Sequence, residues 1–367
     1  MRRSAHGAWR PRVGGRRPAE GRRGHRTGWL IALACLASGC APARPGTAPA
    51  PSESPSWDAS ATGIPTPTHT SAEAAFARNL NPLVGLPAGD ADRVEGRPLA
   101  YAVRFDAVPD QVSGLQALEW VVEAPPAPAM DGSAPVESWT LTGLSLRPAG
   151  SRPALGPVGR AEALQLTISR MFGAAQLLAS GADPDTSTAF VDAGIPLIQL
   201  SLDTGASAST SRGADPLPTP TGPPPAPEWR FDEAPPGGEP VGALTLPWSA
   251  DRATVWRYAA PFEVWQRYRA EGQDLTAVLD ADTGEPLTSA NLLLLLLDGG
   301  PGRESAWVGE GGLRLLRDGR VVEGAWQRAD DRAPLRLSGA DGARLTLRPG
   351  NTWLIAIDVA APYALAP

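Results

Sequence analysis

Short runs of apolar residues that predict β-strands recur in the first half of the chain. The segments RPLAYAVRF (97–105) and ESWTLTGLSLRP (137–148) alternate or run apolar, and LEWVVEAP (118–125) has the length of a short buried strand. Between residues 160 and 179 the apolar residues recur every three or four positions instead of every second position, which predicts one amphipathic helix. Its apolar face consists of Leu164, Ile168, Met171, Ala175 and Leu178. Pro157 and Gly181 bracket this helix. Residues 76–204 therefore form a predicted N-terminal α/β-type domain.

The second half contains a denser series of short strand candidates. They are GALTLPW, TVWRY, NLLLLLL, GLRLLRDGRVVEGAW, PLRLSGADGARLTL and TWLIAID. Asp318-Gly319 and Asp341-Gly342 each lie between such runs, and these pairs tolerate the positive φ of a two-residue hairpin turn. A mostly antiparallel β domain is predicted over residues 229–360, so the fold class of the whole chain is α+β.

Six consecutive leucines, Leu292–Leu297, follow the acidic segment DADTGEP (280–286). The run covers only ~9 Å as a helix or ~20 Å as a strand, too little for a helical membrane span. It has the length of a central strand with both faces covered, and DADTGEP is then the connection before it.

The first 39 residues have the pattern of a secretion signal. Nine arginines precede the apolar run GWLIALACLASGC, whose apolar part is too short for a membrane anchor. Leu36-Ala37-Ser38-Gly39-Cys40 resembles a bacterial lipobox, which predicts cleavage before Cys40 and lipidation of that cysteine. The alternative is a soluble secreted protein, which would expose a free thiol. We expect a palmitate-type lipid anchor in the cell membrane, facing outside the cytoplasm.

Two segments have compositions that are typical of disorder. Residues 40–75 are rich in Pro, Ala, Ser and Thr, which predicts a tether reaching ~30 Å from the membrane. Residues 205–228 carry seven prolines and are predicted to be a linker between the two domains.

The charge and the histidines exclude several classes of function. The chain from Cys40 onward keeps 24 arginines and 38 acids, a net charge of −14, which argues against nucleic-acid binding. The three histidines, His6, His25 and His69, lie in the signal or the tether. A Ser-His-Asp triad, a Cys-His pair and a histidine zinc site are therefore excluded from the fold.

The acids of DADTGEP do not fit a calcium loop. Counted from Asp280, an EF-hand would need an oxygen ligand fifth, glycine sixth and glutamate twelfth, but these positions hold Gly284, Glu285 and Asn291. A solvated turn around Asp280, Asp282 and Glu285 is expected, with no metal site.

Other candidate sites have structural interpretations of equal or greater weight. Glu119 and Glu123 could form a glycosidase pair, but we expect them to be structural or solvated. Gly156-Pro157 could cradle an anion at a helix N-terminus, or could simply start the helix. Seven tryptophans of the β half could stack on wall sugars, but core packing is favoured. These are Trp229, Trp248, Trp256, Trp265, Trp307, Trp326 and Trp353. No catalytic or cofactor-binding residue is predicted.

Several segments resemble the YerB-like bacterial lipoproteins, which contain the N- and C-terminal domains of unknown function numbered 3048. Asn81 to Leu86, NPLVGL, is similar to the family's opening motif, and Arg97-Pro98, Ser113-Gly114-Leu115, Glu123-Ala124 and Gly156-Pro157-Val158 follow its later blocks. Asp280 to Leu287, Asn291 with the leucines, LRDGRVVEGAW (316–326) and LRPGNTW (347–353) follow its C-terminal part more closely. The likeness runs from Asn81 to about Asp358 and skips the linker.

The chain departs from this family at polar positions. Gly159 and Glu162 replace arginines, and Val278 replaces a histidine. The resemblance implies a retained fold and supplies no reaction. The leading hypothesis is a non-enzymatic, lipid-anchored module that binds an envelope protein or a wall polymer. The alternatives are a carboxylate-dependent hydrolase of envelope sugars or peptides, and a calcium-stabilised binding protein.

Overall fold

The computed structural model describes residues 70–71, 80–87, 98–106, 112–125, 138–146, 155–199, 229–234 and 236–367. All of them belong to one compact unit, residues 63–367. The predicted signal, Cys40 and the linker 205–228 lie outside the described residues, as does all of the predicted tether except Thr70 and Ser71. In the described ranges no helix is long and apolar enough to cross a membrane.

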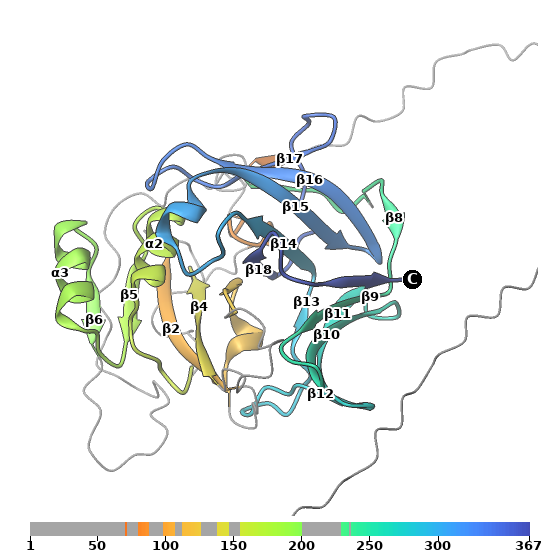
Figure 1. Ribbon diagram of the computed structural model, residues 1–367. Coiled ribbons are helices and arrows are strands. Elements are labelled where there is room, and N and C mark those ends of the chain that lie inside the picture. Colours follow the sequence, from red (N-terminus) through yellow and green to blue (C-terminus); the bar gives the residue numbers. More distant parts are fainter. Residues whose placement is uncertain are drawn as a thin grey trace, which may run out of the picture. The chain divides into compact units, whose positions relative to one another are not determined.

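The fold is mostly β, and one large sheet dominates it (Figure 1). Ten of its strands follow the order β17-β16-β15-β14-β18-β3-β4-β2-β5-β6, and β8 pairs with β16 at the side. The bounds are β2 Leu99–Asp106, β3 Trp120–Glu123, β4 Ser138–Ser145, β5 Gln176–Ala179, β6 Leu197–Gln199, β8 Glu239–Pro240, β14 Asn291–Leu297, β15 Gly309–Arg317, β16 Arg320–Arg328, β17 Arg336–Gly339 and β18 Thr352–Asp358.

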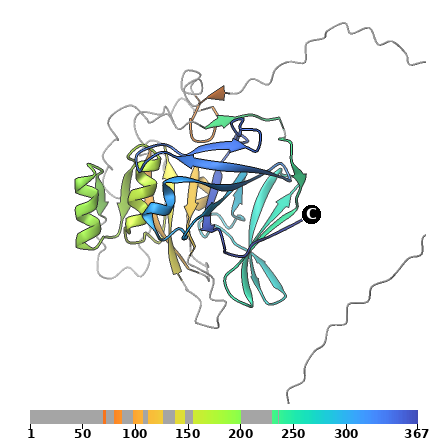
Figure 2. The same cartoon turned by 45° about the horizontal axis from the view of Figure 1, so that its top comes forward.

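A second sheet packs against one face of the first. Its order is β12-β11-β10-β9-β19, with β13 paired to β11, and it lies on the side away from the helices (Figures 1 and 2). The bounds are β9 Ala243–Pro247, β10 Arg252–Ala259, β11 Val264–Glu271, β12 Asp274–Ala277, β13 Thr288–Ser289 and β19 Ala364–Ala366. A third, two-stranded sheet pairs β1, Thr70–Ser71, with β7, Arg230–Phe231. Strand β1 lies inside residues 40–75, which were predicted to be a disordered tether.

The leucine run is a central strand, as predicted. β14 pairs antiparallel with β15 and parallel with β18. Leu293, Leu295 and Leu297 are buried in the core on the helix side, whereas Leu292 and Leu294 are buried in the core under the second sheet. A strand covered on both faces needs apolar residues at every position, which explains the unbroken run.

Strand pairing joins segments from both sides of residues 205–228. β18 pairs in parallel with β3, so the middle of the large sheet consists of β14, β18 and β3 running in the same direction. Arg328 also connects the two sides, because its buried guanidinium donates to the carbonyls of Ala333, Trp307 and Thr167. Burial lowers the pKa of Arg328 to about 10, so the side chain still carries its charge at neutral pH.

The helix predicted over 160–179 is only half correct. Helix α2 spans Ala163–Met171 and starts with a capping box between Glu162 and Gln165. Gly173 and Ala174 then adopt positive φ angles of 75° and 63°, which ends the helix. The following segment forms β5 and pairs in parallel with β2. Tertiary pairing has therefore overridden the helical period of Ala175 and Leu178.

Helix α3, Pro184–Asp192, was not predicted from the sequence, although its start has a clear capping signal. Asp183 caps it by accepting a hydrogen bond from the Thr186 backbone, with Pro184 at the first helical position. This bond lowers the pKa of the Asp183 carboxyl. The described residues contain these two α-helices and are otherwise mainly strands in largely antiparallel sheets, so the predicted β character of the second half is confirmed. The α/β character of residues 76–204 stays a prediction.

The two predicted hairpin turns have different outcomes. Asp318 and Gly319 have φ angles of 53° and 67° and join β15 to β16 directly, as a two-residue turn should. At Asp341-Gly342 only the glycine has a positive φ, and Gly339 donates its backbone N–H to the Ala343 carbonyl across a wider loop. The prediction of a two-residue turn is therefore wrong there.

Candidate functional site

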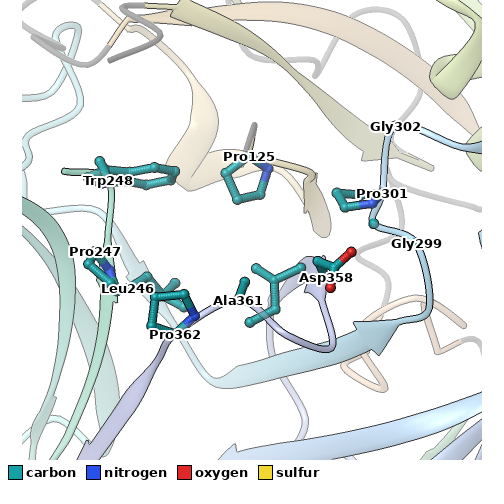
Figure 3. A pocket seen from close by; sticks show the side chains of 12 residues that line it. Pro125, Leu246, Pro247, Trp248, Gly299, Pro301, Gly302, Asp358, Ala361 and Pro362 are labelled. Atoms are coloured by element: carbon teal, nitrogen blue, oxygen red, sulfur yellow. The ribbon is translucent and has the colours of Figure 1, made fainter. Parts of the chain in front are cut away.

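An apolar pocket of about 300 Å³ lies at the carboxyl ends of the three parallel strands (Figure 3). Because β3, β14 and β18 run in the same direction, the segments that follow them meet at one edge of the sheet. Ligands of open α/β sheets often bind at such an edge, although this sheet is mixed. The lining residues are Pro125, Leu246, Pro247, Trp248, Gly299, Gly300, Pro301, Gly302, Ile357, Asp358, Ala361 and Pro362.

Each wall of the pocket comes directly from the end of a strand. Pro125 follows β3, and the loop Gly299–Gly302 follows β14. Asp358 is the last residue of β18. Gly300 has a φ of 80°, and a Cβ atom at this position would lie 3.2 Å from Asp358 Oδ2. Glycine therefore allows both the turn and the close approach of the loop to the carboxylate.

Trp248 is the aromatic wall of the pocket, and it is half-buried. Its indole Nε1 donates a hydrogen bond to Thr254 Oγ1 at 3.0 Å, which fixes the ring. The other six tryptophans of the β half are each at most 2% exposed. Core packing is thus confirmed for those six. Trp248 differs because it presents part of its surface to a cavity.

A buried polar network lies behind Trp248. The Thr254 hydroxyl also accepts from Arg267 Nη2 at 3.4 Å, and this guanidinium forms a salt bridge with Glu123. The guanidinium carbon lies 5.4 Å from the Trp256 ring centroid and 4.9 Å from that of Trp353. A charge held by hydrogen bonds and two aromatic faces is rigidly placed. Trp248 is therefore supported by a fixed framework.

Among the described residues that line this pocket, Asp358 is the only charged one. Its Oδ1 accepts a hydrogen bond from the backbone N–H of Ala360 at 2.8 Å. Within the described ranges, Oδ2 has neither a hydrogen bond nor an ion pair. Figure 3 shows Trp248 and Asp358 at opposite ends of the cavity, with Pro125 on one wall and Ala361 and Pro362 on the other. The pocket is thus elongated, apolar in the middle and acidic at one end.

The two glutamates considered from the sequence lie elsewhere. Glu123 is 1% exposed and is held by Arg267 and by Trp353 Nε1 at 2.7 Å. Glu119 is 3% exposed and accepts from Asn81 Nδ2 at 3.1 Å. Neither lines the pocket, and both are buried, so the structural interpretation is confirmed and the alternative that they are solvated is wrong.

The DADTGEP turn borders a second cavity of about 370 Å³, lined by Arg269 and Asp280 among others. Asp280 is 1% exposed and accepts hydrogen bonds from the backbones of Asp282 and Gln116. The prediction of a solvated turn is therefore wrong for Asp280, whose buried side chain fastens the turn to the fold, and correct for Asp282 and Glu285, which are exposed. In the part of the chain that the structure describes, no cluster of three metal-ligating side chains occurs.

Gly156-Pro157 is not at the start of a helix. Gly156 bridges to Ser113, and α2 begins only at Ala163. An anion site at a helix N-terminus is therefore not formed by this pair. Asp358, Pro125 and Pro301 are pocket residues that were not predicted from the sequence. Their only signal was position, because each follows or ends a strand-like apolar run.

Comparisons with known proteins agree with the predicted resemblance. Residues 244–354 match the family model described as "Protein of unknown function (DUF3048) C-terminal domain". The crystal structure of the YerB protein from Bacillus subtilis is similar, with a TM-score of 0.56 and 19% sequence identity. The match covers 78% of this chain and 99% of that chain. At this identity the likeness shows a shared fold. No curated protein matches the chain.

Proposed function

Since this chain is a YerB-like member of the DUF3048 family through its C-terminal domain, residues 244–354, we propose that it is a lipid-anchored binding protein of the cell envelope. It would hold a protein or a wall polymer in the pocket between Trp248 and Asp358. The observation that carries this proposal is the pocket itself, an apolar cavity at the converging ends of three strands, with an accessible tryptophan at one end and a carboxylate at the other.

The N-terminal sequence supports the envelope location. The lipobox-like segment ending at Cys40 and the Pro-rich residues after it would display the folded unit outside the cytoplasm, away from the lipid surface.

The composition of the two cavities supports binding over hydrolysis. A hydrolase of sugars by the two-carboxylate mechanism needs two acids about 5–10 Å apart around one substrate. Among the described residues, Asp358 is the only acid that lines the pocket at the strand ends, and Asp280 is the only acid that lines the cavity beside the turn. Neither cavity offers the pair that this chemistry requires.

Site-specific photo-crosslinking in cells tests the proposal. A photoreactive amino acid replaces Pro362, an exposed residue of the pocket rim, and in a matched chain it replaces Val191, which is 76% exposed on α3 outside the pocket. We expect a discrete adduct from position 362 that disappears when Trp248→Ala is added, and no such adduct from 191. Equal labelling from both positions, or an adduct that Trp248→Ala leaves unchanged, would refute the proposal.

A further inference from the structure

We propose that the pocket between Trp248 and Asp358 binds the side chain of a lysine carried by a protein partner. This inference rests on the proposed binding function and specifies its ligand. It follows from the charge of the pocket, from the number of free oxygens on its acid, from the apolar walls and from the composition of the chain.

The charge of the pocket selects a cationic ligand. In the described part of the chain, Asp358 is the only charged lining residue, and its Oδ2 has no partner there. Arg303 is the nearby cation, since its Nη1 would lie 3.1 Å from a Cβ atom on Gly299, but it is exposed and forms no ion pair with Asp358 in the described ranges. A carboxylate partly withdrawn from water gains most from a hydrogen-bond donor that carries a positive charge.

The geometry of the carboxylate favours an ammonium group over a guanidinium group. Oδ1 already accepts a hydrogen bond from the Ala360 N–H, so Oδ2 is the oxygen without a hydrogen bond in the described part of the chain. Arginine binds carboxylates best through two parallel hydrogen bonds, whereas the lysine ammonium is a compact charge that needs a single acceptor.

The walls between the two ends fit an aliphatic stem. Pro125, Ala361 and Pro362 offer apolar surface along the cavity, and Trp248 closes the far end (Figure 3). The four methylene groups of lysine can bury against such surface while the charged end reaches an acid. A sugar fits less well, because its hydroxyl groups would need several polar partners and the lining provides one acidic side chain.

The composition of the chain excludes the chain itself as the source of the lysine. The sequence contains no lysine at any of its 367 positions. Neither another segment of this chain nor a second copy of it can therefore supply this side chain.

Titration of the purified full chain with Nα-acetyl-lysine methylamide tests the proposal, with binding followed by calorimetry. The norleucine analogue has the same stem without the ammonium group, and the arginine analogue carries the other cation. We expect the lysine compound to bind at least about tenfold more tightly than either analogue. The norleucine compound cannot form the charge-assisted hydrogen bond, and the guanidinium of the arginine compound fits the single acceptor poorly.

Two carboxyl variants distinguish lysine binding at Asp358 from a general effect of negative charge on affinity. Asp358→Asn keeps the Oδ1 acceptor for Ala360 and should weaken lysine binding by about 10- to 100-fold. Asp298→Asn removes an equal charge from an exposed residue that does not line the pocket, and should change affinity less than about twofold. Equal binding of the norleucine compound, or equal losses in both variants, would overturn the proposal. An adduct from position 362 that depends on Trp248, combined with no preference for lysine, would leave the proposed function standing and refute only the lysine assignment.

Discussion

Arg267 donates two hydrogen bonds to the carboxylate of Glu123, at 2.5 and 2.8 Å, although 144 residues separate the two in sequence. Both side chains are 1% exposed. Glu123 ends a strand of the large sheet, and Arg267 lies in β11 of the second sheet. The pair thus joins the two sheets directly behind the pocket.

Glu123→Gln should destabilise the fold by about 3–5 kcal/mol, because it leaves a buried guanidinium without its counter-charge. Urea denaturation measures the loss as a lower unfolding midpoint. Glu271→Gln is the matched control, since Glu271 pairs with Arg252 and Arg269 near the surface and should contribute less than about 1 kcal/mol. Similar losses in the two variants would contradict the importance of the buried pair.

The same pair shows what the sequence could predict and what it could not. The unbroken leucines predicted β14 because a strand covered on both faces must be apolar at every position. The segment 175–178 was assigned to a helix because its helical spacing is real, but pairing with β2 decided its structure. Glu123 and Arg267, like Trp248 and Asp358, meet through pairing between distant segments. The local pattern of apolar and polar residues does not indicate which distant segments pair, so the pocket could not be predicted from the sequence.

Thr254→Val should loosen Trp248, and it also removes the weaker hydrogen bond that the same hydroxyl accepts from Arg267 at 3.4 Å. The variant keeps the branched shape but removes the acceptor of the Trp248 Nε1 hydrogen bond, at a cost of about 1 kcal/mol. We expect faster quenching of Trp248 by acrylamide, measured as the difference from a Trp248→Phe background, and weaker binding to the pocket. Thr254→Ser restores the hydroxyl and should restore both properties. If Thr254→Ser behaves like Thr254→Val, the hydrogen bond does not position the ring.

Gly319→Ala should destabilise the protein more than Gly342→Ala does. Both glycines have positive φ, 67° and 76°, so each alanine costs about 1 kcal/mol or more in backbone strain. A Cβ atom on Gly319 would also lie 2.8 Å from the Tyr258 ring, whereas the space around Gly342 is open. Thermal unfolding of the two variants measures the difference. An equal decrease in Tm would show that Tyr258 moves aside freely.

Cys40→Ser should abolish lipid attachment, because Cys40 is the proposed lipidation site at the end of the lipobox-like segment. We expect the variant to lose incorporation of labelled palmitate and to leave the membrane fraction. Cys35→Ser is the matched control, because Cys35 lies in the apolar run before the expected cleavage site. Retained labelling in Cys40→Ser, or equal loss in Cys35→Ser, would exclude Cys40 as the anchor.

Fluorine NMR of the full chain labelled with 5-fluorotryptophan tests the binding pocket most directly. The Trp248 resonance is assigned from Trp248→Phe, and the buried Trp256 and Trp265 serve as internal references. On addition of a solubilised envelope fraction from the native host, we predict a saturable shift of the Trp248 resonance with the two references unchanged. A Trp248 resonance that stays in place while the other resonances respond to binding would contradict the assignment of the pocket as the binding site.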